Sequence, residues 1–410
     1  MTALPPPAPH EAASEPLGGH ELSAHFAGGG SPAAPVRKKR KKRTGLILGL
    51  VGGAAVIAAL TITQVSASLG YDTAAENHAD AVAAANSEKT QLRTESTDLQ
   101  TLADSAGLIL ASENEAIVPA PEAEEALANA VADAQTAASE ADELIATDVP
   151  ATGEKPTWFL ELFGASARLG SDADEARALA DDLLAEAADV MMASDAVTES
   201  GVTLLTSAGE AATAFEAAHL SARNDAVIAL RDAAADAVAT TIIDDTAATT
   251  YATLQSAAAE VVATENEELA EKSGPLLNAR LEIEAFARSL APGVLLEFDW
   301  APIVNGAGYN GSMGGYTTWW WDDPGRSVIE LSNSVAEQWP ADRSKALVAH
   351  EVGHAISVKC EDMYDSSTQD SIEKWATAWA ISMGFSDDAN GVWAYGYPPQ
   401  NYIDAAAGCR

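Results

Sequence analysis

The feature that most constrains this chain is an alanine-rich stretch from residue 73 to about residue 290. Larger apolar residues recur in it at helical spacing, as with Leu179, Leu183 and Val190, which places them on one face of a helix. Alanine fills many of the remaining positions, favours helix formation and lets neighbouring helices approach closely. The pattern predicts a helical bundle or stalk over residues 70–291 and a mostly α fold.

Proline and glycine divide this stretch into about five or six predicted helices. The expected breaks fall at Pro119 and Pro121, at 150–156, at 170–172, near Gly201 and at 273–275. The region could act as a sensor or a partner-binding module. The simpler interpretation is a stalk, because it holds no chemically useful cluster of titratable groups.

The charge balance excludes one class of partner. The chain has 61 acidic and 23 basic residues and a formal net charge of −38. Phosphate binding needs the opposite sign, so we expect no nucleic acid as a partner. An acidic surface of this kind more often keeps a protein soluble.

The N-terminal region predicts a membrane anchor. Residues 1–43 are rich in Pro, Gly and Ala and end in a basic run at 37–43, which predicts a disordered tail. Residues 44–67 carry no charge and are long enough to span a bilayer as a helix. Basic residues stay on the cytoplasmic side, so we expect a single-pass cell-membrane protein with an extracytoplasmic C-terminal domain. A cleaved signal peptide ending at 65–67 is the alternative.

The composition changes after Pro292, and a separate small domain is predicted at 292–410. Eight of the nine tryptophans lie there, and glycine reappears. Alternating or β-rich runs predict strands, and a helical run follows them. The expected strands are 294–300, 315–321 and 327–331, and the expected helix is 341–358. This domain is predicted to be α+β.

The predicted helix contains the sequence His350-Glu351-Val352-Gly353-His354. Residues four apart share a helix face, so His350 and His354 can present imidazole nitrogens to one zinc ion (Zn²⁺). Zinc lowers the pKa of a bound water, and Glu351 is placed to take its proton and to deliver it to a leaving amine. The spacing therefore predicts a zinc site with a general base.

A catalytic zinc needs a third protein ligand and an open position. No histidine other than His350 and His354 follows His219, so a carboxylate or a thiolate must serve. Glu373 is the best carboxylate, because it lies in a second predicted helical stretch at 371–380.

The motif with its downstream helical glutamate resembles the gluzincin group of zinc metallopeptidases, and the small domain looks like the minimal members of that group. The resemblance implies a zincin-like domain with His350, His354 and Glu373 as zinc ligands and Glu351 as general base. It also implies that residues 328–331 form an edge strand against which an extended peptide substrate lies.

This chain departs from the family at one position. The family commonly places an aspartate four residues after the glutamate, where it supports a histidine ligand. Thr377 stands there in this chain, and Asp370 is a possible substitute on the same helical face.

The two cysteines allow two interpretations. Cys360 lies where metzincin peptidases place their third histidine, but Ser357 replaces the glycine that their motif requires. We therefore expect a Cys360–Cys409 disulfide rather than a thiolate ligand.

Tyr395, Tyr397 and Tyr402 are candidates for stabilising an oxyanion, and nothing in the sequence separates them.

The function expected from the sequence is a membrane-anchored, extracytoplasmic zinc metallopeptidase. Its partners would be a peptide or protein substrate and, through residues 44–67, the membrane. The alternative is a non-catalytic cell-surface helical binding or structural protein with a structural or vestigial zinc site. Glu351 favours the enzyme, because a purely structural site needs no general base.

Overall fold

The computed structural model describes residues 44–112 and 116–410, with residues 44–54 as backbone alone. The chain divides into two compact units, residues 1–66 and 67–410. The predicted tail at 1–43 and its basic run lie outside the described residues.

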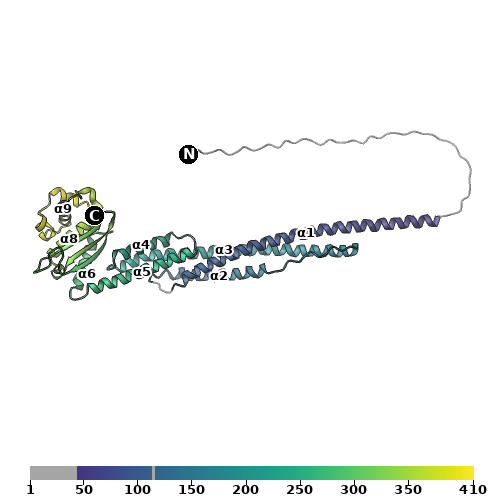
Figure 1. Cartoon of the computed structure of the whole chain (residues 1–410), viewed down its shortest axis with the longest axis horizontal. Coiled ribbons are helices and arrows are strands. Elements are labelled where there is room, and N and C mark those ends of the chain that lie inside the picture. The colour runs from purple at the N-terminus through teal and green to yellow at the C-terminus, as the bar shows by residue number, and fades with distance from the viewer. Residues whose placement is uncertain (1–43, 113–115) are drawn as a thin grey trace, which may run out of the picture. The chain divides into compact units, whose positions relative to one another are not determined.

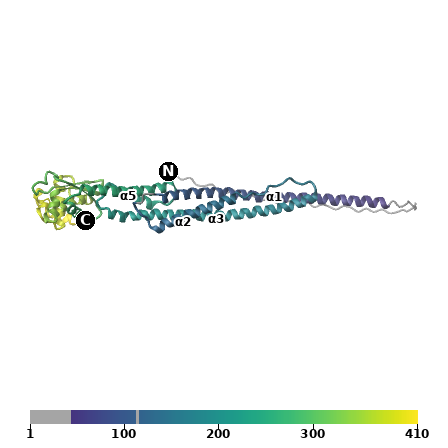
Figure 2. The same ribbon diagram turned by 90° about the horizontal axis from the view of Figure 1, so that it is seen from below.

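The described part of the chain is mostly helical. Figures 1 and 2 show α2 and α3 side by side, and α3 packs on α4, which packs on α5. Alanine and leucine side chains form most of the shared core, as the composition predicts. These helices are α1 (Thr44–Leu110), α2 (Pro121–Ile145), α3 (Phe159–Ala218), α4 (Asn224–Ala239) and α5 (Asp245–Glu271).

Two of the predicted helix breaks are wrong, because α3 continues through residues 170–172 and through Gly201. Gly201 serves packing there. A Cβ on Gly201 would lie 2.7 Å from Cγ1 of Ile243, and one on Gly209 would lie 2.7 Å from Cγ2 of Val238. Glycine in this helix therefore lets another segment approach it closely, and the helix tolerates the lower propensity.

Two helix ends lack a proline or glycine signal in the sequence. α3 ends at Ala218 before α4, and α4 ends at Ala239 before α5. The start of α5 is fixed by Asp244, whose carboxylate accepts hydrogen bonds from the backbone N–H groups of Thr246 at 2.8 Å and Ala247 at 3.0 Å. A capping side chain thus sets this boundary.

The predicted transmembrane anchor at 44–67 is wrong. No helix in the described part of the chain is long and apolar enough to cross a membrane. Residues 44–67 are the beginning of α1, which continues unbroken past Asp72 to Leu110. The side chains described in this segment include several polar ones, Thr61, Thr63, Gln64 and Ser66. The single-pass topology and the localisation inferred from the anchor are corrected with it, whereas the membrane as a partner stays a prediction.

The C-terminal region contains a three-stranded sheet covered by helices. The strands are ordered β1-β3-β2, with β1 parallel and β2 antiparallel to β3. α6 and α8 pack against the sheet, and α9 packs on α8. The elements are α6 (Leu277–Leu290), β1 (Leu295–Ala301), β2 (Gly315–Trp320), β3 (Asp323–Ser332), α7 (Asn333–Glu337), α8 (Asp342–Ser357), η1 (Val358–Met363), α9 (Gln369–Ser382), η2 (Asp388–Asn390), α10 (Val392–Tyr395) and α11 (Gln400–Ala406).

The strand order corrects the expected substrate strand. Residues 328–331 belong to β3, which pairs on both sides and is the middle strand. The strand beside α8 with one unpaired edge is β2. Strand order depends on contacts distant in sequence, so the local pattern of β3 does not reveal it.

The predicted Cys360–Cys409 disulfide is confirmed, with an S–S distance of 1.94 Å. It joins η1, at the end of α8, to the residues after α11. Trp379 Nε1 donates to the Cys409 carbonyl oxygen at 2.9 Å, which fixes the same segment against α9. Both sulfurs are engaged in this bond, so Cys360 is not a metal ligand here.

A buried charge network joins the helical region to the sheet. Lys272 Nζ, just after α5, lies 3.2 Å from Glu268 Oε2 and 3.3 Å from Glu284 Oε1 on α6. Trp300 on β1 donates from Nε1 to the same Glu284 oxygen at 3.1 Å. The three charged side chains are at most 4% exposed. Buried charges are tolerated only when paired in this way, so the network fixes these elements together.

We expect Lys272→Met to lower the free energy of unfolding by about 3–5 kcal/mol, because it removes the buried cation that Glu268 and Glu284 share and leaves each carboxylate with one arginine that is more exposed than Lys272. Chemical denaturation of the full chain measures the loss. The matched control is Lys155→Met, which breaks the exposed Lys155–Asp72 pair. Its cost should stay below about 1 kcal/mol. Equal losses in the two variants would show that the Lys272 network contributes no more than a surface pair.

Candidate metal centre

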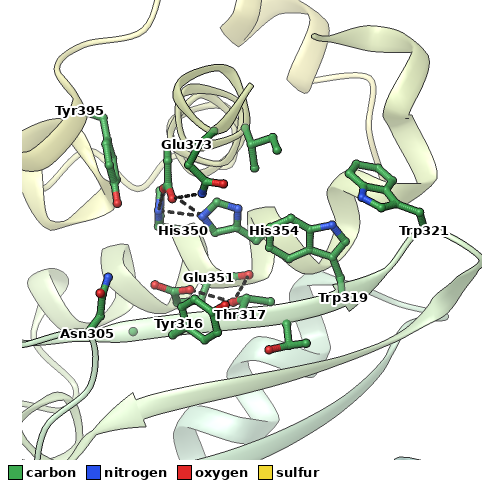
Figure 3. A pocket seen from close by; sticks show the side chains of 14 residues that line it. Asn305, Tyr316, Thr317, Trp319, Trp321, His350, Glu351, His354, Glu373 and Tyr395 are labelled. Carbon is green, nitrogen blue, oxygen red and sulfur yellow. Dashed lines mark hydrogen bonds and ion pairs between the residues drawn. The ribbon is translucent and has the colours of Figure 1, made fainter. Parts of the chain in front are cut away.

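The two motif histidines share one face of α8, one turn apart. His350 Nε2 and His354 Nε2 are 3.2 Å from each other, and both side chains are buried. Figure 3 shows the two imidazoles pointing toward Glu373. The i, i+4 spacing therefore brings the rings together as the sequence predicts.

Glu373 on α9 completes a triangle of ligand atoms. Its Oε2 lies 3.2 Å from Nε2 of His350 and 3.2 Å from Nε2 of His354. Ligands held at zinc–nitrogen and zinc–oxygen distances in a tetrahedral site would be about 3.3 Å apart. The donor set and the three equal separations therefore fit a zinc ion.

The approach of α9 depends on Gly353, inside the motif. A Cβ at Gly353 would lie 2.9 Å from the carbonyl oxygen of Ala376 and 3.0 Å from its Cα. Any larger residue would push α9 away from α8. Since Glu373 precedes Ala376 by less than one turn, this close crossing brings its carboxylate to the histidines.

Electrostatics also favour a charged Glu373. Burial raises the pKa of this carboxyl, but hydrogen bonds from His350 and His354 and their charge outweigh burial and hold the pKa well below its usual range. Gln369 Nε2 donates to the other carboxylate oxygen at 2.8 Å. Oε2 is thereby left facing the two imidazoles as an anionic ligand atom.

Glu351 lies on the other side of the histidines, against β2 (Figure 3). Thr317 donates from Oγ1 to Glu351 Oε2 at 2.7 Å. Burial raises the pKa of Glu351, while the charge of His350 and the Thr317 hydrogen bond oppose the increase. A Cβ at Gly315 would lie 2.3 Å from Glu351 Oε1, so only glycine leaves room for this carboxylate.

Thr377 occupies the position of the family's aspartate and contacts His350. Its Oγ1 lies 3.4 Å from His350 Nδ1 and donates to the Glu373 carbonyl oxygen at 2.8 Å. A hydroxyl that donates to a carbonyl can accept from Nδ1–H, which leaves Nε2 free to bind a metal. Asp370, the expected substitute, instead accepts from Lys374 at 2.6 Å and is 73% exposed.

His354 is oriented by stacking. Its ring lies parallel to the Trp319 indole, with centroids 5.3 Å apart and planes 4° apart. Its buried Nδ1 has no hydrogen-bond partner among the residues that the structure describes. Contact with Trp319 therefore restrains this ring where the hydrogen bond of a usual histidine ligand is missing.

The structure separates the three tyrosine candidates. Tyr395 stacks on His350 with ring centroids 5.9 Å apart, and Figure 3 shows its hydroxyl directed toward the centre. Burial and the charge of Glu373 raise the pKa of Tyr395 to about 12, so it remains a hydrogen-bond donor at neutral pH. Tyr402 bonds to Ser371 at 2.9 Å, and Tyr397 is 68% exposed.

The centre opens into a cleft of about 510 Å³. β2 forms one wall with Tyr316, Thr318 and Trp319, and α9 and Tyr395 lie opposite. The volume is within the usual range for ligand sites, about 300–1,000 Å³. The three candidate ligands therefore face a space that can admit a substrate.

Sequence reasoning missed Thr317, Gln369 and Trp319. Gln369 is one turn before Glu373, so the helical spacing of the pair was a usable signal. Thr317 and Trp319 alternate along β2, which places both on the same face of the strand. No sequence signal indicated that this face would meet α8.

No known protein family, curated protein or solved structure matches this chain. The likeness to zinc peptidases therefore depends on the motif and on the geometry described above. The His350, His354 and Glu373 triangle is a candidate site in the described part of the chain.

We expect Gly391→Ala to weaken zinc binding about 10–100-fold, the usual range for residues that orient metal ligands. A Cβ there would lie 2.8 Å from His350 Nδ1 and 2.3 Å from Thr377 Oγ1. Competitive zinc titration measures the affinity. Gly396→Ala is the control, since Gly396 also has a positive φ, but a Cβ there meets nothing within 4 Å. An equal loss in both variants would attribute the effect to backbone strain.

Proposed function

We propose that this chain is a zinc-dependent hydrolase of peptide bonds. The observation that carries the proposal is the triangle of His350, His354 and Glu373 beside the buried carboxylate of Glu351, all lining one cleft. Two imidazoles and one carboxylate are a ligand set of catalytic zinc, which keeps a position open for water or substrate.

Glu351 is the general base in this proposal. When bound, zinc lowers the pKa of water and polarises a carbonyl group. Glu351 takes a proton from the attacking water and delivers it to the leaving amine. Burial raises the pKa of Glu351, which brings its proton affinity closer to the needs of both transfers.

Tyr395 is the donor for the developing oxyanion. It lines the same cleft as Glu351, on the side of Glu373 and His350. With a pKa of about 12, its hydroxyl is protonated at neutral pH and donates a hydrogen bond to the carbonyl oxygen as negative charge builds up there.

The unpaired edge of β2 would hold the substrate. Residues from Gly315 to Trp319 line the cleft, and β2 pairs with β3 along its other edge only. An extended peptide can add to such an edge through main-chain hydrogen bonds. This would align the scissile carbonyl with Glu351.

A purely structural zinc site accounts for less of this arrangement. Structural zinc sites usually have four protein ligands and are closed. The candidate cluster has three ligand residues in the described part of the chain and faces a cleft. Burying the carboxylate of Glu351 costs free energy, and a structural site gains nothing from it.

We expect Glu351→Gln to lower kcat by about 10²–10⁴-fold while zinc remains bound, because it removes proton transfer and leaves the ligands intact. Cleavage of a quenched fluorescent peptide library and metal analysis of the purified chain measure the two effects. Equal cleavage by this variant and the unaltered chain would reject the mechanism.

The companion variant Glu373→Ala should lose zinc, because two imidazoles alone remain as protein ligands. Lys374→Ala, at the neighbouring half-buried position, is the control and should retain it. Stoichiometric zinc in Glu373→Ala would reject the ligand assignment.

We expect Tyr395→Phe to lower kcat about 10²-fold with little change in KM, since the lost hydrogen bond acts mainly in the transition state. Steady-state kinetics on one cleaved peptide distinguish the two parameters. Tyr397→Phe is the control, because Tyr397 is exposed and does not line the cleft. A change confined to KM would contradict the oxyanion role.

A further inference from the structure

A second cavity adjoins the metal centre on another side of Glu351. It has a volume of about 310 Å³ and shares Gly315, His350, Glu351 and Tyr395 with the larger cleft. A substrate whose reacting carbonyl lies at Glu351 can therefore extend a side chain or its next residues into this cavity.

The side chains farther from the centre make the cavity apolar. Met313, Leu347 and Trp393 line it, together with alanines of η2 and of α10. Trp393 is 87% exposed, which is unusual for so large an apolar surface. Burying an apolar substrate side chain against these groups would stabilise the complex.

One positively charged side chain, that of an arginine, lines this cavity. Arg343 lies on the same face of α8 as Leu347 and His350, and it lines the cavity. It is exposed and forms no ion pair or hydrogen bond through its side chain in the described part of the chain. An arginine left unpaired in so acidic a chain is available to a carboxylate from outside.

The spacing along α8 sets where that carboxylate must be. Seven residues separate Arg343 from His350, which corresponds to about 10 Å of helix. An extended peptide covers this distance in about three residues. Asp388 also lines the cavity and repels an anion, so a carboxylate in the cavity is favoured where it can pair with Arg343.

We propose that this cavity is a specificity pocket for a large apolar residue followed, within about three residues of the scissile bond, by a carboxylate that pairs with Arg343. The inference rests on the proposed peptidase function. The carboxylate is either the free C-terminus of the peptide or an aspartate or glutamate side chain.

The test measures peptide binding without turnover. The full chain carrying Glu351→Gln is loaded with zinc, and N-terminally labelled peptides are titrated by fluorescence anisotropy. The peptides share one leucine and end in a free carboxylate, in an amide, in aspartate amide or in lysine amide. We expect the two peptides with a carboxylate to bind about fivefold more tightly than the other two, as for an exposed charge pair. Comparing the peptide with a free C-terminal carboxylate and the aspartate amide peptide shows whether the C-terminus or a side chain supplies the carboxylate.

The decisive variant is Arg343→Glu, which should reverse the preference so that the lysine peptide binds best. Lys345→Glu makes the same charge change on α8 at a position that does not line the cavity, and it should leave the preference intact. Measured against a matched peptide in which alanine replaces the leucine, Trp393→Ala should reduce the advantage of leucine over alanine without affecting folding, because the side chain is exposed.

The possible outcomes test the pocket and the proposed peptidase activity separately. An unchanged preference in Arg343→Glu, an equal change in Lys345→Glu, or no measurable binding would overturn the pocket. Binding with the expected preferences but no cleavage by the unaltered chain would reject the peptidase proposal alone. Cleavage without the preferences would reject the pocket alone.

Discussion

The close crossing of α8 and α9 at Gly353 is the contact on which the rest of the centre depends. It requires a position without a side chain, because Cβ would lie 2.9 Å from the Ala376 carbonyl oxygen. That crossing brings a carboxylate from a separate helix within 3.2 Å of both imidazoles. The disulfide from Cys360 to Cys409 and the packing of α11 on α9 connect the same pair of helices a second time. The ligand geometry thus follows from backbone proximity.

The sequence predicted the parts of the site that are local. His350 and His354 are set by the period of one helix, and Glu373 was identified because it lies in a second predicted helical stretch after the motif. The surrounding contacts come from segments whose positions depend on the tertiary fold. Thr317 meets Glu351 only because β2 lies beside α8, whereas residues 328–331, the expected edge strand, belong to the middle strand. Periodicity reports which face of a strand is buried, but it does not report the neighbouring strand.

The helical region shows the same limit. The spacing of alanine and leucine predicted helices and their apolar faces. Gly201 was interpreted as a helix break, but it lies inside α3, where Ile243 packs against it. The predicted anchor was read from an uncharged run of residues, but no helix in the part of the chain that the structure describes is long and apolar enough to cross a membrane. Glycine and alanine are ambiguous signals, because both serve membrane helices, tight helix contacts and ordinary solvent-exposed helices.

Glycines 315, 353 and 391 each admit a neighbouring group where a Cβ would collide with Glu351, Ala376 or Thr377. Such positions have no acceptable replacement, since every other residue adds at least one carbon atom. In the alanine-rich helices, by contrast, many positions accept other small or helix-favouring residues. Related chains would therefore diverge unevenly. The helical region would lose recognisable similarity first, and a few scattered glycines around the motif would be the last trace of common descent.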